Sequence, residues 1–443
     1  MSQKIVKALP ELLEAGVISQ ETADRIKAYY DEKEGQHPNL LFSIFGVLGA
    51  LLIGLGIFLL VAHNWDELSR AAKTAIAFAP LALGQAAAAY ALLSRNDSVA
   101  WRESASTFLI LAIGVCIALI SQIYQIPGNI SSFLLTWLLL GLPLVYILRS
   151  SMAGILYLIG ITYYACEIGY FNYPQSESPI YWGLLLLLAP HYYLLLKKPT
   201  AGNFFLAFNW LIPTSLLIVL GILAQKEVHL MFVAYFSLLG VFYLVGHTPF
   251  FQRLKNIFNG YEIIGSLGMI ILLLVASFEW FWKEMGQETA LFAALHAPES
   301  WLALGLTIAC GALLFLNKEK PDWTDGQLKL WTPLAFAVIF FTGFENTTLP
   351  FILTNVLLFA LGVSTIWHGA KANHLGILNY GLLILTALIV CRFLDDRFSF
   401  VTRGIAFVAL GIGFFMANYW MLRQRKILSV EQNRVNWNST ESE

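Results

Sequence analysis

The residues of this chain that are best suited to chemistry are charged side chains between two apolar segments near the C-terminus. They are Arg392, Asp395, Asp396, Arg397 and Arg403. Guanidinium groups bind carboxylates and phosphates through parallel hydrogen bonds, so Arg392 and Arg403 can form an anion or headgroup site with Asp395 and Asp396. The alternative is a pair of salt bridges that closes the turn between the segments. In the anion-site interpretation, we expect Arg392 to face a cavity because it lies deeper in its segment.

A second polar group, His63, Asn64, Trp65 and Asp66, follows the first apolar segment. Histidine and aspartate can bind a proton or a metal ion, but one of each is a weak metal signal. Tryptophan is typical of the membrane interface, and asparagine and aspartate favour a turn that begins a helix. A structural role is therefore the stronger interpretation.

A third polar group, Gln122, Tyr124 and Gln125, lies where another apolar segment ends. These side chains can line a cavity or form hydrogen bonds with a sugar or a lipid headgroup. They can also hold neighbouring helices together. The sequence leaves these interpretations open.

Ionisable residues within apolar segments are candidates for function, because a charge in lipid is costly. In this chain they are Glu167, His191 and Glu262, with His229, Glu279 and His368 near segment ends. Glu167 lies close enough to the end of its segment to reach water. A single histidine such as His191 is more often a packed, hydrogen-bonded side chain than a proton relay.

No motif of nucleotide-driven or hydrolytic chemistry accompanies these residues. The sequence contains no GxxxxGK[ST], HExxH or GxSxG motif. Its 4 cysteines lack the spacing of metal sites and are interpreted as small core residues. We therefore expect no cofactor and no metal. The formal net charge is −1, and no soluble basic cluster indicates nucleic acid as a partner.

The elements that must position these residues are apolar helices. Of 443 residues, 58% are hydrophobic and 12% are charged. A helix of about 17 or more apolar residues crosses a bilayer, where only helices and closed barrels satisfy their backbone groups. The sequence therefore predicts an all-α, polytopic transmembrane helix bundle of about 14 spans, with 12 or 13 if short connectors merge neighbouring segments. The predicted spans are 40–62, 74–93, 107–123, 133–148, 151–169, 179–196, 203–224, 228–246, 261–282, 300–316, 330–344, 349–369, 374–393 and 401–421.

The distribution of basic residues predicts the orientation, because cytoplasmic loops carry an excess of lysine and arginine. With the N-terminus inside, all but seven of the 27 basic residues fall in cytoplasmic segments. The exceptions are Arg70, Lys73, Lys226, Lys283, Arg392, Arg397 and Arg403. We therefore expect a multi-pass protein of the inner membrane with both termini in the cytoplasm.

The predicted domains are a cytoplasmic helical hairpin at 1–35, the transmembrane bundle at 40–421 and a cytoplasmic tail at 422–443. In the hairpin, Gly16 is expected to end the first helix and Ser19 to cap the second. The hairpin is either a solubilising tail or a docking module for a protein partner. A further segment, 283–299, is predicted to form a short interfacial helix on the outer leaflet.

Four short sequences carry a resemblance to a known family. They are LLEAGVIS at 12–19, AHNWD at 62–66, SQIYQ at 121–125 and RFLDD at 392–396, the last followed by Arg403-Gly404. Together they resemble the bacterial membrane-protein family catalogued as domain of unknown function 2157. The resemblance implies a many-spanning protein of the bacterial inner membrane, and it supplies no reaction.

Three classes of function remain open. The first, and the favoured one, is transport or handling of an envelope lipid or small solute without an ATPase of its own. The second is a non-catalytic scaffold or sensor that docks partners through the N-terminal hairpin. The third is an intramembrane lipid-modifying enzyme. Membrane lipids are expected partners in each case, and the oligomeric state is not fixed by the sequence. A polar cavity in the bundle would favour the first class, and a solid apolar interior the second.

Overall fold

The computed structural model describes residues 9, 12–13, 15–26, 65–171, 178–197, 202–224, 229–252, 259–288, 297–316 and 328–393, and scattered residues between 401 and 419. Every regular element in these ranges is a helix, which confirms the all-α prediction. The chain divides into two units, Met1–Ala79 and Pro80–Glu443.

In the first unit, a glycine ends the first helical segment. Gly16 has a φ of +69°, its N–H donates to the Leu13 carbonyl, and the Val17 N–H donates to the Leu12 carbonyl. This is the Schellman arrangement, which needs a left-handed residue and therefore favours glycine. The Ser19 hydroxyl accepts a 3.3 Å hydrogen bond from the backbone N–H of residue 22, as expected of an N-cap. The predicted span 40–62 lies outside the described residues.

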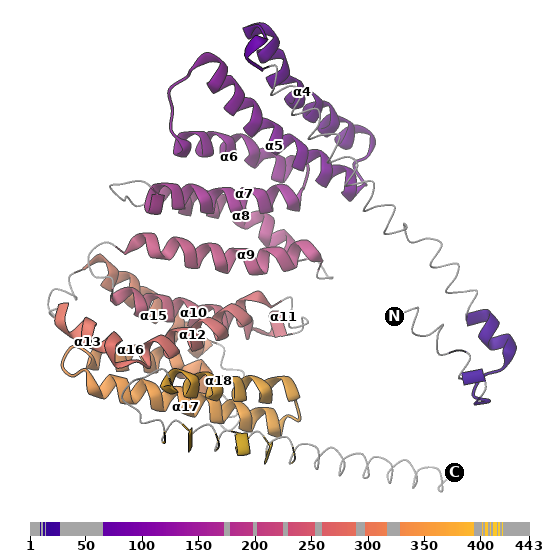
Figure 1. The fold of residues 1–443 in the computed structure, drawn as a ribbon. Helices are drawn as coiled ribbons and strands as arrows, with labels where there is room; N and C mark the ends of the chain where they lie inside the picture. Colours follow the sequence, from indigo (N-terminus) through magenta and orange to yellow (C-terminus); the bar gives the residue numbers. More distant parts are fainter. Residues whose placement is uncertain are drawn as a thin grey trace. The chain divides into compact units, whose positions relative to one another are not determined.

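The helix α4 (Arg70–Ser94) begins in the first unit and ends in the second. In the second unit, α5 packs against α6 and α7, and α7 packs against α8 and α9 (Figure 1). The bounds of these helices are α5 (Val99–Tyr124), α6 (Ile130–Ile147), α7 (Ser151–Cys166), α8 (Pro179–Leu196) and α9 (Asn203–Leu220). A π-helical turn (Glu167–Phe171) follows α7, and a 3-10 turn (Gly221–Leu223) follows α9.

Farther along the chain, α10 packs against α12, α15 and α16, while α17 packs against α16 and α18. The bounds are α10 (Leu230–Gly246), α11 (Pro249–Gln252), α12 (Gly260–Ala276), α13 (Glu279–Glu288), α15 (Pro298–Leu316), α16 (Leu328–Thr342), α17 (Thr348–Lys371) and α18 (Leu375–Phe393). At Gly240, α10 and α16 approach closely, since an added Cβ would lie 2.4 Å from the Pro333 ring. Beside it, the buried rings of Phe236 and Phe336 stack with centroids 4.2 Å apart. These contacts join the middle of α10 to α16.

Nine helices of the described part are long and apolar enough to cross a membrane, or ten if the bent pair α12–α13 counts as one span. The helices α10 and α16 are apolar but shorter. The fold is therefore that of a multi-pass membrane protein, as predicted. The number of spans stays a prediction, because 40–62 and most of 401–421 lie outside the described residues.

The predicted span 261–282 is not one continuous helix but a bent pair of helices. α12 ends at Ala276, α13 begins at Glu279, and the two are bent by 78°. The carbonyls freed by the break have side-chain partners: the indole N–H of the buried Trp282 donates to the Ala276 carbonyl, and the amide of the half-buried Asn355 donates to the Ser277 carbonyl. A break in an apolar helix is tolerated where side chains satisfy its backbone in this way. Because α13 continues to Glu288, it contains the beginning of the predicted interfacial segment 283–299, of which 289–296 lies outside the described residues.

Candidate functional site

Arg392, the first candidate from the sequence, lies in the last turn of α18 and contacts the break between α12 and α13. Its Nη2 donates a 3.1 Å hydrogen bond to the Ser277 hydroxyl. The guanidinium lies 4.8 Å from the centre of the Phe278 ring and 5.7 Å from that of Phe351. Ser277 directly follows α12, so the cation lies at the negative end of that helix dipole.

The other members of this group, Asp395, Asp396, Arg397 and Arg403, lie outside the described residues. Their pairing with Arg392 therefore stays a prediction. Arg392 is not among the residues that line the apolar cavity between α10, α15 and α16, nor among those that line the larger cavity at the ends of α10 and α12. Its described contacts favour the structural interpretation.

The second and third polar groups are placed mainly at helix ends. His63 and Asn64 lie outside the described residues, whereas Trp65 begins a 3-10 turn (Trp65–Glu67) in which Asp66 is exposed. The Lys73 ammonium lies 5.7 Å from the centre of the Trp65 ring. These contacts agree with an anchor and turn.

Gln122, Tyr124 and Gln125 are exposed at the end of α5. Gln125 is its C-cap, with a φ of +51° and an N–H that donates to the Gln122 carbonyl. The described contacts of this group are therefore those that terminate helix α5.

The intramembrane candidates Glu167 and His191 are buried. Glu167 lies where α7 becomes π-helical. Its burial there differs from the expectation that its side chain reaches water. His191 Nε2 lies 3.3 Å from the Ser151 hydroxyl, and its ring packs against Phe208. His191 is thus a packed histidine with a polar partner.

Sequence reasoning missed Glu103, whose carboxylate caps α7. It accepts hydrogen bonds from the Ser150 hydroxyl at 2.5 Å and from the backbone N–H groups of Ser151 and Met152 at 2.9 and 2.8 Å. A carboxylate at a helix N-terminus satisfies free N–H groups and complements the dipole. Ser150, directly before the helix, is a residue type that favours a cap, but the sequence does not reveal that a residue on α5 completes it.

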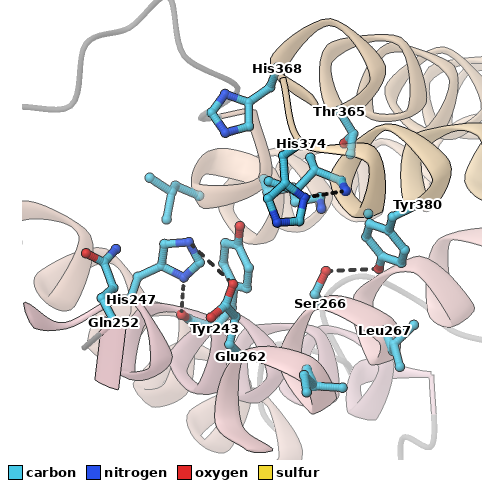
Figure 2. A pocket seen from close by; sticks show the side chains of 15 residues that line it. Tyr243, His247, Gln252, Glu262, Ser266, Leu267, Thr365, His368, His374 and Tyr380 are labelled. Atoms are coloured by element: carbon cyan, nitrogen blue, oxygen red, sulfur yellow. Dashed lines mark hydrogen bonds and ion pairs between the residues drawn. The ribbon is translucent and has the colours of Figure 1, made fainter. Parts of the chain in front are cut away.

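The best candidate site is a cavity of about 640 Å³ at the ends of α10, α12, α16, α17 and α18 (Figure 2). One wall carries His247, Glu262 and Ser266, and the facing wall carries His368 and Tyr380. The loops at these helix ends are all assigned to the cytoplasmic side by the distribution of basic residues. The charged or titratable lining residues are Tyr243, His247, Glu262, Lys329, His368, His374 and Tyr380.

Asn259 fixes the Glu262 carboxylate in the cavity wall. Its side-chain oxygen accepts from the Glu262 N–H at 3.3 Å, which caps α12, and its amide donates to Glu262 Oε2 at 2.6 Å and to the Gly246 carbonyl at 2.9 Å. His247 Nδ1 lies 3.0 Å from the Tyr243 carbonyl, and its Nε2 lies 4.0 Å from Glu262 Oε1. One carboxylate oxygen of Glu262 therefore accepts a hydrogen bond from Asn259, and the other faces His247.

Lys329, in the first turn of α16, supplies the cation of the cavity. Its ammonium lies 4.3 Å from the centre of the Tyr380 ring, whose hydroxyl is 2.9 Å from the Ser266 hydroxyl. Among the residues that the structure describes, no carboxylate lies within 4.0 Å of this ammonium. An ammonium on an aromatic face beside a cavity is suited to bind an anion.

The sequence identified Glu262 and His368 as ionisable candidates but not Lys329, His247 or Tyr380. In the sequence, Lys329 is only one of the basic residues whose distribution predicts the orientation in the membrane. Within the described ranges, no three histidine, cysteine, aspartate or glutamate side chains are grouped so that they could hold a metal ion. The cavity as described offers charge and hydrogen bonds to a ligand.

The fold thus defines an all-α, multi-pass membrane protein. Residues 10–154 match the family model described as "Predicted membrane protein (DUF2157)", which confirms the resemblance for the three short sequences that lie in this range. The fourth, RFLDD at 392–396, lies outside the matched residues. The matched region ends within α7, so the cavity lies beyond it. Neither a curated protein nor a solved structure matches the chain.

Proposed function

We propose that this membrane protein binds and handles a small anionic solute, or the anionic headgroup of an envelope lipid, in the cavity between α10, α12, α16, α17 and α18. The single observation that carries the proposal is Lys329. Its ammonium lies against an aromatic ring beside a cavity of about 640 Å³, with no carboxylate of the described residues in salt-bridge distance.

The charge balance of the lining supports an anionic ligand. One lysine and three histidines can carry positive charge there, against the single carboxylate of Glu262. A lysine ammonium is a compact point charge with three donors and is a common phosphate-binding group. Ligand sites combine a few such polar groups with apolar walls, which Leu267 and Ile377 provide here.

The lining also supports a ligand that has an apolar part. Tyr243 and Tyr380 line the cavity with aromatic rings that also carry hydroxyl groups, and Leu330 lies next to Lys329. A lipid headgroup with the first part of its chains has this combination of charge and apolar surface. A free anion shares only the charge, so the two ligands share a phosphate or carboxylate group and differ in mass and apolar area.

The test is native mass spectrometry of the purified full-length protein, with release and identification of bound lipids and metabolites. We compare the unchanged protein with Lys329→Gln and with Lys197→Gln. Lys197 is the matched control because its ammonium also lies over a tyrosine, 4.4 Å from the centre of the Tyr193 ring, but outside the cavity.

We expect an anionic lipid or an anionic metabolite to remain bound to the unchanged protein and to Lys197→Gln, and to be lost from Lys329→Gln. The mass of the released compound separates a lipid from a free solute. Equal retention of the same anion by Lys329→Gln would contradict the proposal, as would a bound compound that carries no negative charge.

A further inference from the structure

We infer that anion binding in this cavity is coupled to the uptake of one proton by the pair His247 and Glu262. The inference rests on the proposed function and adds its regulation. It follows from the hydrogen-bonding roles that the geometry assigns to the two side chains.

The position of His247 decides which of its nitrogens carries hydrogen. Its Nδ1 lies 3.0 Å from the Tyr243 carbonyl oxygen, which only accepts hydrogen bonds, so Nδ1 must donate. In the neutral imidazole, Nε2 is then an acceptor. That acceptor lies 4.0 Å from Glu262 Oε1, which as a carboxylate oxygen is also an acceptor. The two atoms face each other with no hydrogen between them.

One added proton completes this pair. Placed on His247 Nε2 or on the Glu262 carboxylate, it provides the missing donor, and the separation of 4.0 Å can shorten to a hydrogen bond. The other Glu262 oxygen is already held by Asn259, 2.6 Å away. The side chains of His247 and Glu262 are 27% and 41% exposed, so water in the cavity can deliver and remove the proton.

The proton changes how the cavity attracts an anion. Without it, the negative charge of Glu262 opposes an anion at Lys329. With it, the pair has no net charge, and the Lys329 ammonium acts unopposed. Because coupling between two ligands is reciprocal, an anion that binds at Lys329 must also favour proton uptake by the pair.

Other titratable or charged groups of the described residues also face this cavity. They are Tyr243 on α10, Lys329 on α16, His368 on α17, His374 between α17 and α18, and Tyr380 on α18. His374 is less suited to take up the proton, since its Nδ1 accepts a 3.3 Å hydrogen bond from the Ile377 N–H. His368 makes no such bond, so the test must separate it from the pair.

The test is calorimetric titration of the full-length protein in a neutral detergent with two probes, sulfate and dihexanoyl phosphatidylglycerol. Neither probe titrates between pH 5.5 and 8, so a pH dependence belongs to the protein. Measurements in two buffers of different protonation enthalpy give the number of protons taken up per bound anion. The sulfate and lipid arms distinguish a free anion from a headgroup.

We expect uptake of close to one proton, and an affinity that falls about tenfold per pH unit above the pH at which the pair loses its proton. Glu262→Gln should bind the probe at least tenfold more tightly than the unchanged protein at pH 7, with no proton uptake. His247→Gln, which also removes the titrating pair, should abolish proton uptake and provides the same test if Glu262→Gln does not fold. Glu345→Gln, at an exposed carboxylate outside the cavity, is the control and should leave the proton uptake at one.

Binding without proton uptake by the unchanged protein would overturn this inference and leave the proposed function standing. Continued proton uptake by Glu262→Gln and His247→Gln would assign the proton to another group, with His368 the next to substitute, and would also overturn it. Binding of neither probe at any pH would count against the proposed function itself.

Discussion

Two cationic side chains near opposite ends of α12 have different surroundings. Arg392 donates to the Ser277 hydroxyl after the C-terminus of α12 and lies beside two phenylalanine rings. Lys329 lies near the N-terminal part of α12, over one tyrosine ring and beside a cavity. The first cation is bound by a hydroxyl group and two rings of the protein, and the second lines a cavity that a ligand can occupy.

This difference is the opposite of what the sequence pattern around the two residues suggests. Arg392 belongs to the most conspicuous charge cluster, and Lys329 is a single lysine before an apolar segment. The comparison predicts that substitutions around Arg392 lower stability, and that substitution of Lys329 removes binding with little loss of stability.

The largest effect is expected for Arg392→Gln, which loses a charge-assisted hydrogen bond and two ring contacts. We expect the free energy of unfolding to fall by about 2 kcal/mol, measured as a lower melting temperature in detergent. Arg95→Gln is the control, because Arg95 is exposed and bonds only weakly to the Tyr90 hydroxyl, 3.4 Å away. If Arg392→Gln melted like its control and lost a bound anion, the arginine cluster would be the anion site instead.

A smaller loss is expected for Asn355→Leu. The amide donates to the Ser277 carbonyl at 3.0 Å and to the Phe351 carbonyl at 2.8 Å, so its loss leaves the break in α12–α13 without one of its donors. We expect the free energy of unfolding to fall by about 1–2 kcal/mol. Since Arg392 and Asn355 both bond to Ser277, the double variant should lose less or more than the sum of the single losses. If the stability losses of the two single variants were strictly additive in the double variant, Arg392 would not contribute to the stability of the break.

Glu103→Gln tests a charged group near the beginning of α5 that, unlike Lys329, has hydrogen-bond partners within the protein. Its carboxylate accepts from two backbone N–H groups at the start of α7, and an amide is a weaker acceptor. We expect a loss of about 1 kcal/mol, and no change in anion binding. Glu345→Gln serves as the exposed control, and equal melting of the two variants would show that the cap contributes little.

Much of the helical framework is predictable from the sequence, and the cavity is not. The span predicted at 179–196 coincides with α8, because Pro179 marks its first position and a long apolar run follows. The break at Ser277 escapes hydropathy, because the donor that satisfies it, Asn355, lies 78 residues away. Glu262 was identified as an ionisable residue in an apolar segment.

The partners of Glu262 escape the same reasoning. His247 follows the end of α10 and reads as a loop residue, and it meets Glu262 only because α10 and α12 pack side by side. Lys329 and Tyr380 meet in the same way, from the beginnings of α16 and α18. Periodicity and composition predict which segments are helices, but contacts between distant helices depend on packing that a single sequence does not reveal.

The smallest effect on stability, and the largest on binding, is expected for Lys329→Gln. Its ammonium has no ion pair among the described residues and loses one ring contact, so we expect the free energy of unfolding to fall by less than about 1 kcal/mol. Melting in the absence of ligand checks this, with Lys197→Gln beside it. A large destabilisation of Lys329→Gln alone would mean that the lysine, like Arg392, is held by the protein.

The central claim is tested most directly by the affinity of the folded Lys329→Gln variant for dihexanoyl phosphatidylglycerol and for sulfate at pH 6, measured by calorimetry. The account predicts that the unchanged protein and Lys197→Gln bind at least one probe with equal affinity. It predicts that Lys329→Gln binds that probe at least tenfold more weakly, a loss of about 1.4 kcal/mol or more. Equal affinity of Lys329→Gln and the unchanged protein would contradict the account.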